Sequence, residues 1–228
     1  MALEVLYRDD DIVVVNKPSG MLVHRGWDND EVVAMTVVRD LVGQHVHPVH
    51  RLDRPTSGAL IMALHKDAAR SLCTAFEHGQ IAKAYLALVR GVTPEQGLID
   101  HPVPKKPKGE RVAAQTAFER KFIFERYSLV ATWPKTGRLH QIRRHLKHIT
   151  HPLIGDVNYG KGEHNRLFRK RFGLNRLALH AASISFEHPV RGESMVIHAP
   201  MPEDLAGPLR AIGVPEPLMV LSPQDETA

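Results

Sequence analysis

The segment HRLDRPTSGALIMAL, at residues 50–64, joins a charged loop directly to an apolar run. Residues 58–64 carry only small or apolar side chains, a composition typical of a short buried strand. Pro55 and Gly58 keep the residues before that strand out of a helix. Asp53 is therefore predicted to lie in a fixed loop on a rigid scaffold, where catalytic groups are often found.

Two arginines, Arg51 and Arg54, lie close to Asp53 in the chain. A neighbouring guanidinium lowers the pKa of a carboxyl group, so we expect Asp53 to be ionised at neutral pH. The spacing alone leaves two interpretations open. Asp53 is either a catalytic carboxylate or the acidic partner in a loop salt bridge that only caps a turn.

Patterns of apolar residues on either side of this segment predict the other elements. Short or alternating apolar runs predict strands at residues 3–7, 12–16, 58–64, 83–90, 114–124, 127–132, 182–187 and 194–198. Helical spacing and capping signals predict helices at residues 32–42, 68–78, 139–149 and 203–212. Strands dominate and do not alternate regularly with helices, which favours a mixed α+β fold.

We expect one domain over residues 1–213, with a junction between two sub-domains near residues 100–113. Residues 101–111 are rich in proline and lysine and are predicted to form an exposed loop or linker. Residues 214–228 are polar and contain proline, so they are predicted to form a disordered tail. No run of apolar residues is long enough to predict a transmembrane helix.

Cys73 is the only cysteine in the 228 residues, which excludes an intrachain disulfide and a cysteine-rich metal site. The first residues lack the basic and apolar regions of a signal peptide. These features favour a reducing, cytoplasmic setting. Because the sequence shows no heptad pattern and no long exposed apolar helix, we expect a monomer.

Charge is distributed unevenly along the chain. Residues 101–180 hold 18 Lys and Arg against 5 Asp and Glu, whereas the whole chain has a net charge of +5. This asymmetry predicts a basic face suited to a polyanion such as nucleic acid. The other interpretation, that these residues only solubilise loops, stays open at this point.

The segment KTGRLHQIRRHL, at residues 135–146, runs from a turn into a helix within the basic region. Ile142 and Leu146 fall on one face of that helix, which leaves the basic side chains for other contacts. A helix N-terminus next to Arg138 and His140 suits phosphate binding. A solvated basic helix face is the alternative.

Two further segments stand out. KAY, at residues 83–85, opens a strand, and the ring of Tyr85 could stack on a base, although the pattern taken alone favours a core aromatic. NKPSGMLVH, at residues 16–24, is a strand that runs into a turn, and its residue types alone indicate no function.

Neither a metal nor a nucleotide cofactor is expected. The histidine pairs His47/His50 and His148/His151 have basic neighbours that would repel a cation, and no HExxH sequence is present. No Walker loop occurs, and no GxGxxG sequence follows a strand. Ser57 lacks the preceding glycine of a nucleophile elbow.

Together these segments resemble the RluA-type family of pseudouridine synthases. HRLDRPTSG resembles the family's catalytic motif, NKPSGMLVH its N-terminal motif, and KAY the motif that carries an active-site tyrosine. TGRLHQIRRHL, followed by HPLIGDVNYG at residues 151–160, resembles its C-terminal motif, and RLALHA at residues 176–181 extends the likeness. RRHLKHITHPLIGD and the run from Gly162 to Ala181 are similar to the TruC branch, which modifies a uridine in the T-stem region of tRNA.

The resemblance implies a pseudouridine-synthase fold, with a mixed, mainly antiparallel sheet and with helices and loops around a central active-site cleft. It also implies isomerisation of uridine to pseudouridine, without a redox cofactor or ATP. Asp53 is expected to act at the sugar, as nucleophile or as base. The motifs are expected to hold no second acidic residue, which argues against a glycosidase.

The resemblance also implies roles for other residues. Arg143 is expected to pair with Asp53, Tyr85 to stack on the uracil and relay its C5 proton, and Ile142 to pack against the base. Arg51 is expected to enter the duplex as the target uridine leaves the stack. The expected RNA-binding residues are Arg51, Arg138, His140, Arg144 and Lys147.

Because the motifs begin at residue 16, we expect no N-terminal S4-like domain. The stretch between Asp100 and Ala114 is also short for this family. The missing S4-like domain and this short stretch are both expected to affect how the protein binds RNA. We expect tRNA as the partner, with a ribosomal-RNA synthase of the same family as the alternative. A non-catalytic RNA-binding module is the remote alternative.

Overall fold

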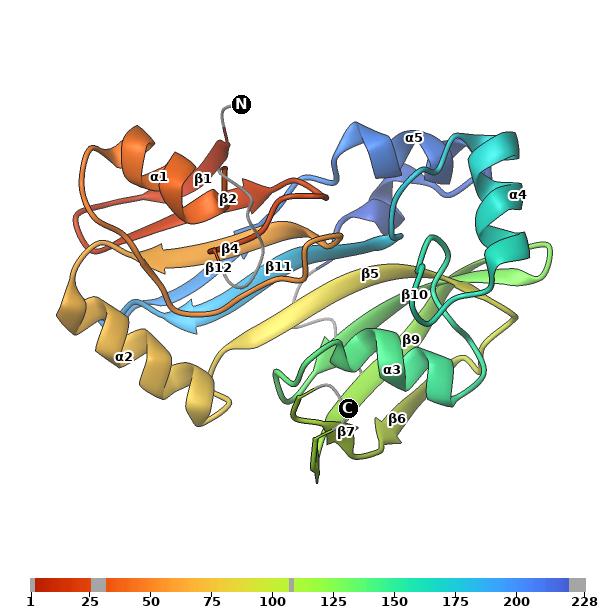
Figure 1. The fold of residues 1–228 in the computed structure, drawn as a ribbon, viewed down its shortest axis with the longest axis horizontal. Coiled ribbons are helices and arrows are strands. Elements are labelled where there is room, and N and C mark those ends of the chain that lie inside the picture. The colour runs from red at the N-terminus through yellow and green to blue at the C-terminus, as the bar shows by residue number, and fades with distance from the viewer. Residues whose placement is uncertain (1–2, 26–31, 107–108, 222–228) are drawn as a thin grey trace.

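The computed structural model describes residues 3–25, 32–106 and 109–221. Within these residues, ten strands form one sheet that crosses the whole molecule (Figure 1). These strands are β1 (Glu4–Arg8), β2 (Ile12–Lys17), β3 (His47–Pro48), β4 (Ser57–Ala63), β5 (Ala82–Arg90), β6 (Gln96–Asp100), β9 (Gln115–Phe124), β10 (Tyr127–Pro134), β11 (Leu179–Glu187) and β12 (Ser194–His198). The helices are α1 (Ala34–Val42), α2 (Lys66–Glu77), α3 (Gln141–His148), α4 (Gly162–Phe172), α5 (Glu203–Ala211) and the 3-10 helix η1 (Glu216–Met219).

The sheet has the order β1-β2-β4-β11-β5-β10-β9-β6, with β12 paired to β11 and β3 paired to β4. All of these pairs are antiparallel except β4 and β11, which are parallel. The prediction of an α+β fold with a mixed, mainly antiparallel sheet is therefore confirmed.

Helices cover both faces of the sheet, because alternate residues of a strand point to opposite sides. On one face α1 packs through Val38 and α3 through Leu146, and on the other α2 packs through Leu72 and α4 through Phe168. Tyr85 on β5 packs against the clusters beneath both α1 and α3. Tyr85 thus links the apolar cluster beneath α1 to the one beneath α3, on the face that both helices cover.

The predicted strands and helices are confirmed, with ends that differ by a few residues. The elements that were not predicted include β6, α4, the two-residue strand β3 and the 3-10 helix η1. Helix α4 buries only His164 and Phe168, so its apolar periodicity is weak. The loop expected over residues 101–111 contains a small hairpin, β7 (Val103–Pro104) with β8 (Arg111–Val112), and residues 107–108 lie outside the described residues.

The predicted start of the disordered tail, at residue 214, is too early in the chain. Val214, Met219 and Leu221 are buried in the core under α4 and α5. The hydroxyl of Ser183 on β11 donates to the Leu221 carbonyl at 2.6 Å. Polar and proline residues hid these apolar anchors in the sequence, and residues 222–228 lie outside the described part of the chain.

Residues 100–113, where a junction between sub-domains was expected, connect β6 to β9, which are neighbours in the same sheet. Among the described residues, no helix combines the length and the apolar character that crossing a membrane requires.

Candidate active site

The loop that carries Asp53 is held from one side by the turn after β2. Lys17 is completely buried, and its ammonium donates to three carbonyl oxygens, including that of Arg54 at 3.3 Å. The hydroxyl of Ser19 donates to the Pro55 carbonyl at 2.8 Å. The N-terminal motif, whose residues alone indicated no function, therefore anchors the Asp53 loop.

The other end of the loop is tied to β11. The Ser57 hydroxyl lies 2.8 Å from Nδ1 of His180 and accepts a bond from Nη2 of Arg176 at 2.6 Å. At Gly58 the backbone has a φ of +121°, and a Cβ there would lie 2.1 Å from the Ala181 carbonyl oxygen. Only glycine fits this close approach of β4 to β11.

Arg143, from α3, contacts Asp53 as the resemblance implied. Its Nη1 donates to Oδ2 of Asp53 at 3.0 Å. The Arg143 side chain is only 4% exposed, whereas that of Asp53 is 18% exposed. The ion pair is thus closed on the arginine side and accessible on the carboxylate side.

A second carboxylate, Asp156, holds the other edge of Arg143. Its Oδ2 accepts from Nε of Arg143 at 2.7 Å and its Oδ1 accepts from Nη2 at 3.0 Å. The expectation that the motifs hold no second acidic residue is wrong, because Asp156 belongs to HPLIGDVNYG. However, the Asp156 side chain is fully buried, so it cannot reach a leaving group as a glycosidase acid must.

Tyr85 and Ile142 contribute to the same apolar cluster on the face that α3 covers. Ile142 is buried, and half-buried Tyr85 packs against the same apolar cluster. Burial raises the pKa of Tyr85 far above its usual range, and the negative charge of nearby Asp53 raises it further. The structure therefore brings a neutral phenol, an apolar side chain and the Asp53 carboxylate together.

His140, which precedes α3, has a left-handed backbone conformation with a φ of 53°, uncommon for a residue other than glycine. Its Nδ1 lies 2.9 Å from the Tyr159 hydroxyl, and its Nε2 lies 3.8 Å from Oδ2 of Asp53. Burial lowers the pKa of His140, and the Asp53 charge opposes that effect. His140, expected to bind RNA, thus lies beside Asp53.

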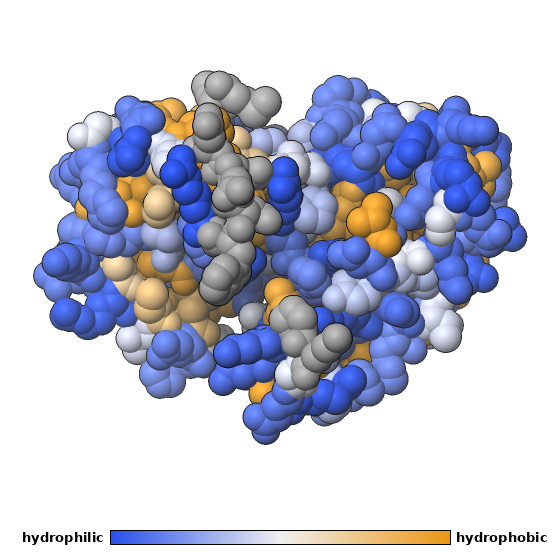
Figure 2. Space-filling view, in the orientation of Figure 1, coloured by the Kyte–Doolittle hydropathy of each residue, from blue (hydrophilic) through white to orange (hydrophobic). Residues whose placement is uncertain are grey.

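The other expected RNA-binding residues differ in exposure. Arg51, Arg138 and Lys147 are exposed. Arg144 is half-buried, and its guanidinium donates at 3.0 Å to the Tyr159 hydroxyl and at 3.0 Å to a carbonyl of β7. Arg144 therefore braces α3 against its neighbours. Hydrophilic side chains predominate on the surface around α3 (Figure 2).

Sequence reasoning missed the residues that support the site, although all of them lie within the quoted motifs: Lys17, Asp156, Tyr159, Arg176 and His180. Two of them carried usable signals. Lys17 ends a strand that begins with four apolar residues, and Asp156 is one of only 5 acidic residues among the many basic ones of residues 101–180. A buried lysine needs hydrogen-bond acceptors, and a carboxylate in a basic region attracts an arginine. These two rules predict that Lys17 binds carbonyl oxygens and that Asp156 pairs with an arginine.

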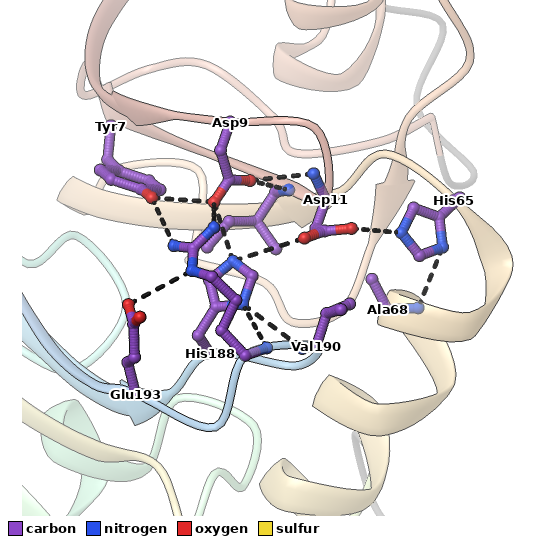
Figure 3. A network of polar contacts seen from close by, with 10 residues as sticks. Tyr7, Asp9, Asp11, His65, Ala68, His188, Val190 and Glu193 are labelled. Atoms are coloured by element: carbon purple, nitrogen blue, oxygen red, sulfur yellow. Dashed lines mark hydrogen bonds and ion pairs between the residues drawn. The ribbon is translucent and has the colours of Figure 1, made fainter.

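A separate polar cluster, drawn in Figure 3, lies beside the end of β4 that is farther from Asp53. Nε2 of His188 is 2.8 Å from Oδ2 of Asp9 and 3.8 Å from Oδ2 of Asp11, a grouping that could offer ligands to a metal ion. Nη1 of Arg191, however, lies 2.9 Å from the same oxygen of Asp9, and its positive charge opposes a cation there. We interpret this cluster as a structural link between the β1–β2 and β11–β12 turns.

The chain matches known proteins over most of its length. The model of the RNA pseudouridylate synthase family matches residues 11–148. The tRNA pseudouridine synthase C of Haemophilus ducreyi is 44% identical, in a match that covers 87% of this chain and 91% of that protein. The protein of the same name from Vibrio cholerae is 42% identical, in a match that covers 96% of this chain and 99% of that protein.

Solved structures show the same fold. Human RNA pseudouridylate synthase domain containing 4 has a TM-score of 0.75 and 26% identity, with 92% of each chain covered. Human RNA pseudouridylate synthase domain containing 1 has a TM-score of 0.72 and 27% identity, with 89% of this chain and 86% of that chain covered. The family match extends over more than half of the chain and includes Asp53, Tyr85 and Arg143. The chain belongs to the RNA pseudouridylate synthase family.

Proposed function

We propose that this protein isomerises a specific uridine of tRNA to pseudouridine, with Asp53 as the catalytic carboxylate. Its relatives at 42% and 44% identity are named tRNA pseudouridine synthase C, which favours tRNA over ribosomal RNA. The observation that carries the proposal is the accessible Asp53 carboxylate, held at 3.0 Å by buried Arg143.

The reaction breaks the bond between uracil N1 and ribose C1′ and forms a bond between C5 and C1′. N1 gains a proton and C5 loses one, so no oxidant, reductant or ATP is consumed. Asp53 acts on the ribose, either as a nucleophile or as a base. Both roles need a carboxylate oxygen that substrate can reach, and the contact with Arg143 is made through Oδ2 alone.

We assign Tyr85 to the detached uracil. Its ring provides a surface for stacking, Ile142 packs nearby, and its hydroxyl can relay the C5 proton. The negative charge of Asp53 contributes to the raised pKa of Tyr85. A covalent bond from Asp53 to C1′ would remove that charge and so lower the pKa of Tyr85. The phenol would then become more acidic at the stage when the C5 proton must move.

RNA binding requires that the target uridine leave its helix. The Asp53 side chain is only 18% exposed, so it cannot meet a uridine that remains stacked. Arg51 is exposed and lies two residues before Asp53, which suits it to fill the gap left in the duplex. We assign exposed Arg138 and Lys147 to phosphate contacts.

We further propose that the enzyme acts as a monomer in the cytoplasm and without a nucleotide cofactor. The reaction transfers no group from a donor. Cys73 is exposed and carries a free thiol, which suits a reducing compartment.

The test uses tRNA tritiated at uracil C5 and measures tritium released into water. We expect the wild-type protein to release tritium, and Asp53→Asn to lower the rate by at least about 1000-fold, as the loss of a nucleophile or base does. Asp67→Asn, at an exposed position on α2, is the matched control and should keep the wild-type rate. Release by Asp53→Asn at the wild-type rate would contradict the assignment.

A further inference from the structure

His140 places a ring nitrogen beside Asp53 without bonding to it. Its Nε2 lies 3.8 Å from Oδ2 of Asp53, a distance too long for a hydrogen bond. Among the residues that the structure describes, Nε2 has no hydrogen-bond partner. The side chains of His140 and Asp53 are 25% and 18% exposed, so a molecule that binds at Asp53 can also reach Nε2.

The hydrogen bonds of His140 leave its proton on Nε2. Burial lowers the pKa of His140 more than the negative charge of Asp53 raises it, so the ring is neutral at neutral pH and carries one N–H. Its Nδ1 lies 2.9 Å from the Tyr159 hydroxyl, whose oxygen accepts from Nε of Arg144 at 3.0 Å. The Tyr159 proton is therefore donated to Nδ1, and Nε2 is the donor that lies beside Asp53.

The backbone of His140 is held in a conformation that few side chains adopt. Its φ is 53° and its ψ is 31°, in the left-handed region. The side chain of the next residue, Gln141, accepts from the Arg138 N–H at 3.0 Å and donates to the Gln115 carbonyl at 2.8 Å. The His140 carbonyl accepts from the Arg144 N–H at 3.0 Å. These contacts fix the start of α3 and the position of the imidazole, and residues constrained in this way concentrate at functional sites.

The proposed reaction brings one substrate oxygen close to this donor. Asp53 acts on the ribose, where O2′ is bonded to C2′ and lies two bonds from C1′. The base and the 2′-hydroxyl of a ribonucleoside are on opposite faces of the sugar, so a carboxylate that attacks C1′ opposite the departing uracil approaches from the 2′-hydroxyl side. Because Nε2 of His140 and Oδ2 of Asp53 are 3.8 Å apart, one hydroxyl oxygen can lie about 2.9 Å from both.

We propose that His140 is a specificity-determining residue, whose Nε2 donates a hydrogen bond to the 2′-hydroxyl of the target uridine. This inference rests on the proposed function. The 2′-hydroxyl is the group by which a protein distinguishes RNA from DNA at a given position. A donor that is fixed to bind a substrate hydroxyl loses its partner when that hydroxyl is absent, which disfavours the analogue. His140 therefore makes the reaction selective for ribose over 2′-deoxyribose at the target position.

The test compares two tRNAs that differ only in the sugar of the target uridine, which is ribose in one and 2′-deoxyribose in the other. The target is the position that the wild-type protein converts. Single-turnover rates are measured at saturating protein by digesting the tRNA and separating its nucleosides by chromatography. The ratio of the rate on the ribose tRNA to the rate on the deoxyribose tRNA is the ribose preference.

We expect His140→Asn to lower the rate about 10-fold on the ribose tRNA and less than about twofold on the deoxyribose tRNA, as the loss of one hydrogen bond does. The ribose preference should thus fall by close to the same factor as the first rate. Asparagine tolerates the left-handed backbone, and its shorter side chain leaves the position of Nε2 empty.

Further variants isolate the Nε2 donor. His140→Gln should keep most of the ribose preference, because its amide group reaches as far as Nε2 and can donate. Tyr159→Phe keeps the aromatic ring that lies against Arg143 and Arg144. It loses the hydroxyl that holds the His140 proton on Nε2, so the ribose preference should fall about threefold. His78→Gln, at an exposed position that ends α2, is the matched control and should change neither rate.

An unchanged ribose preference in folded His140→Asn overturns the inference, whether both rates fall equally or neither rate falls. If His140→Asn does not fold, a wild-type ribose preference in folded Tyr159→Phe overturns it. A wild-type protein that converts no uridine of the ribose tRNA contradicts the proposed function itself. The failure of that function and the failure of this inference are therefore distinguishable.

Discussion

Asp53, Arg143 and Asp156 form a chain of charges that runs from the accessible part of the site into its interior. Their side chains are 18%, 4% and 0% exposed, respectively. Two negative charges share one positive charge, and the buried carboxylate holds the arginine with two bonds. The uncompensated negative charge therefore lies mainly on Asp53, where, in the proposed reaction, it stabilises positive charge that develops at ribose C1′ as the glycosidic bond breaks.

Two histidines within the motifs serve the scaffold rather than the chemistry. Nε2 of His50 accepts the Ile61 N–H at 3.0 Å, and Nδ1 of His180 lies 2.8 Å from the Ser57 hydroxyl. Burial lowers the pKa of His50 to about 3 and that of His180 to about 4. Both are therefore neutral in the folded protein at neutral pH, and both hold the strand β4 that follows Asp53.

These histidines predict a loss of stability in acid. The unfolded chain takes up protons near pH 6.5, whereas the folded protein resists protonation until about pH 3 to 4. Stability is therefore complete above pH 6.5 and falls below it, by about 1.4 kcal/mol per pH unit for each such histidine. Urea unfolding of His50→Gln should show a shallower dependence of the free energy of unfolding on pH. Exposed His78→Gln is the control, and an unchanged slope in His50→Gln would count against this explanation.

Sequence alone singled out Asp53, Tyr85 and Arg143 as candidates, because each lies in a recognisable motif and has a side chain suited to one chemical role, and the structure brings Arg143 into contact with Asp53. It did not identify Asp156 or Lys17 as supporting residues. Asp156 acquires its role from Arg143, and Lys17 acquires its role from the Arg54 carbonyl. Such roles depend on contacts that exist only after the strands and turns have assembled.

Helices α3 and α4 are both basic but lie on opposite faces of the sheet. Ile142 and Leu146 of α3 pack in one apolar cluster, and Phe168 of α4 packs in another, formed by alternate residues of the same strands. The apolar stripe of α3 was visible in the sequence, whereas that of α4 was hidden by its charged residues. Of these two helices, α3 supplies the residue that contacts Asp53, which is Arg143.

This arrangement predicts that basic residues near α3 contribute more to RNA binding than those of α4. Arg138→Gln with Lys147→Gln should weaken tRNA binding and lower the slope of log Kd against log salt by about 1 to 2, since each lost phosphate contact contributes somewhat less than 1. Arg144 is left unchanged because it braces α3. The matched control is Arg166→Gln with Arg169→Gln on the exposed side of α4. If the α4 variant lost more of the slope, the RNA would have to lie on the other face.

The whole molecule brings its distant motifs together through the central strands. β11 pairs in parallel with β4, which follows Asp53, and antiparallel with β5, which carries Tyr85. The sequence predicted each of these strands, but strand order depends on long-range pairing that local patterns do not encode. The same limit explains the misplaced start of the tail, because Val214 and Leu221 find their apolar partners in elements far away in the chain.

The assembled site predicts one outcome in the cell. Pseudouridine is mapped chemically in tRNA and ribosomal RNA from a strain that lacks this protein, with wild type or Asp53→Asn supplied in its place. We expect one uridine position in tRNA to lose its pseudouridine in that strain and to regain it only with wild type, while ribosomal RNA is unchanged. Persistence of every tRNA pseudouridine in the deletion strain, or restoration by Asp53→Asn, would contradict a tRNA pseudouridine synthase that depends on Asp53.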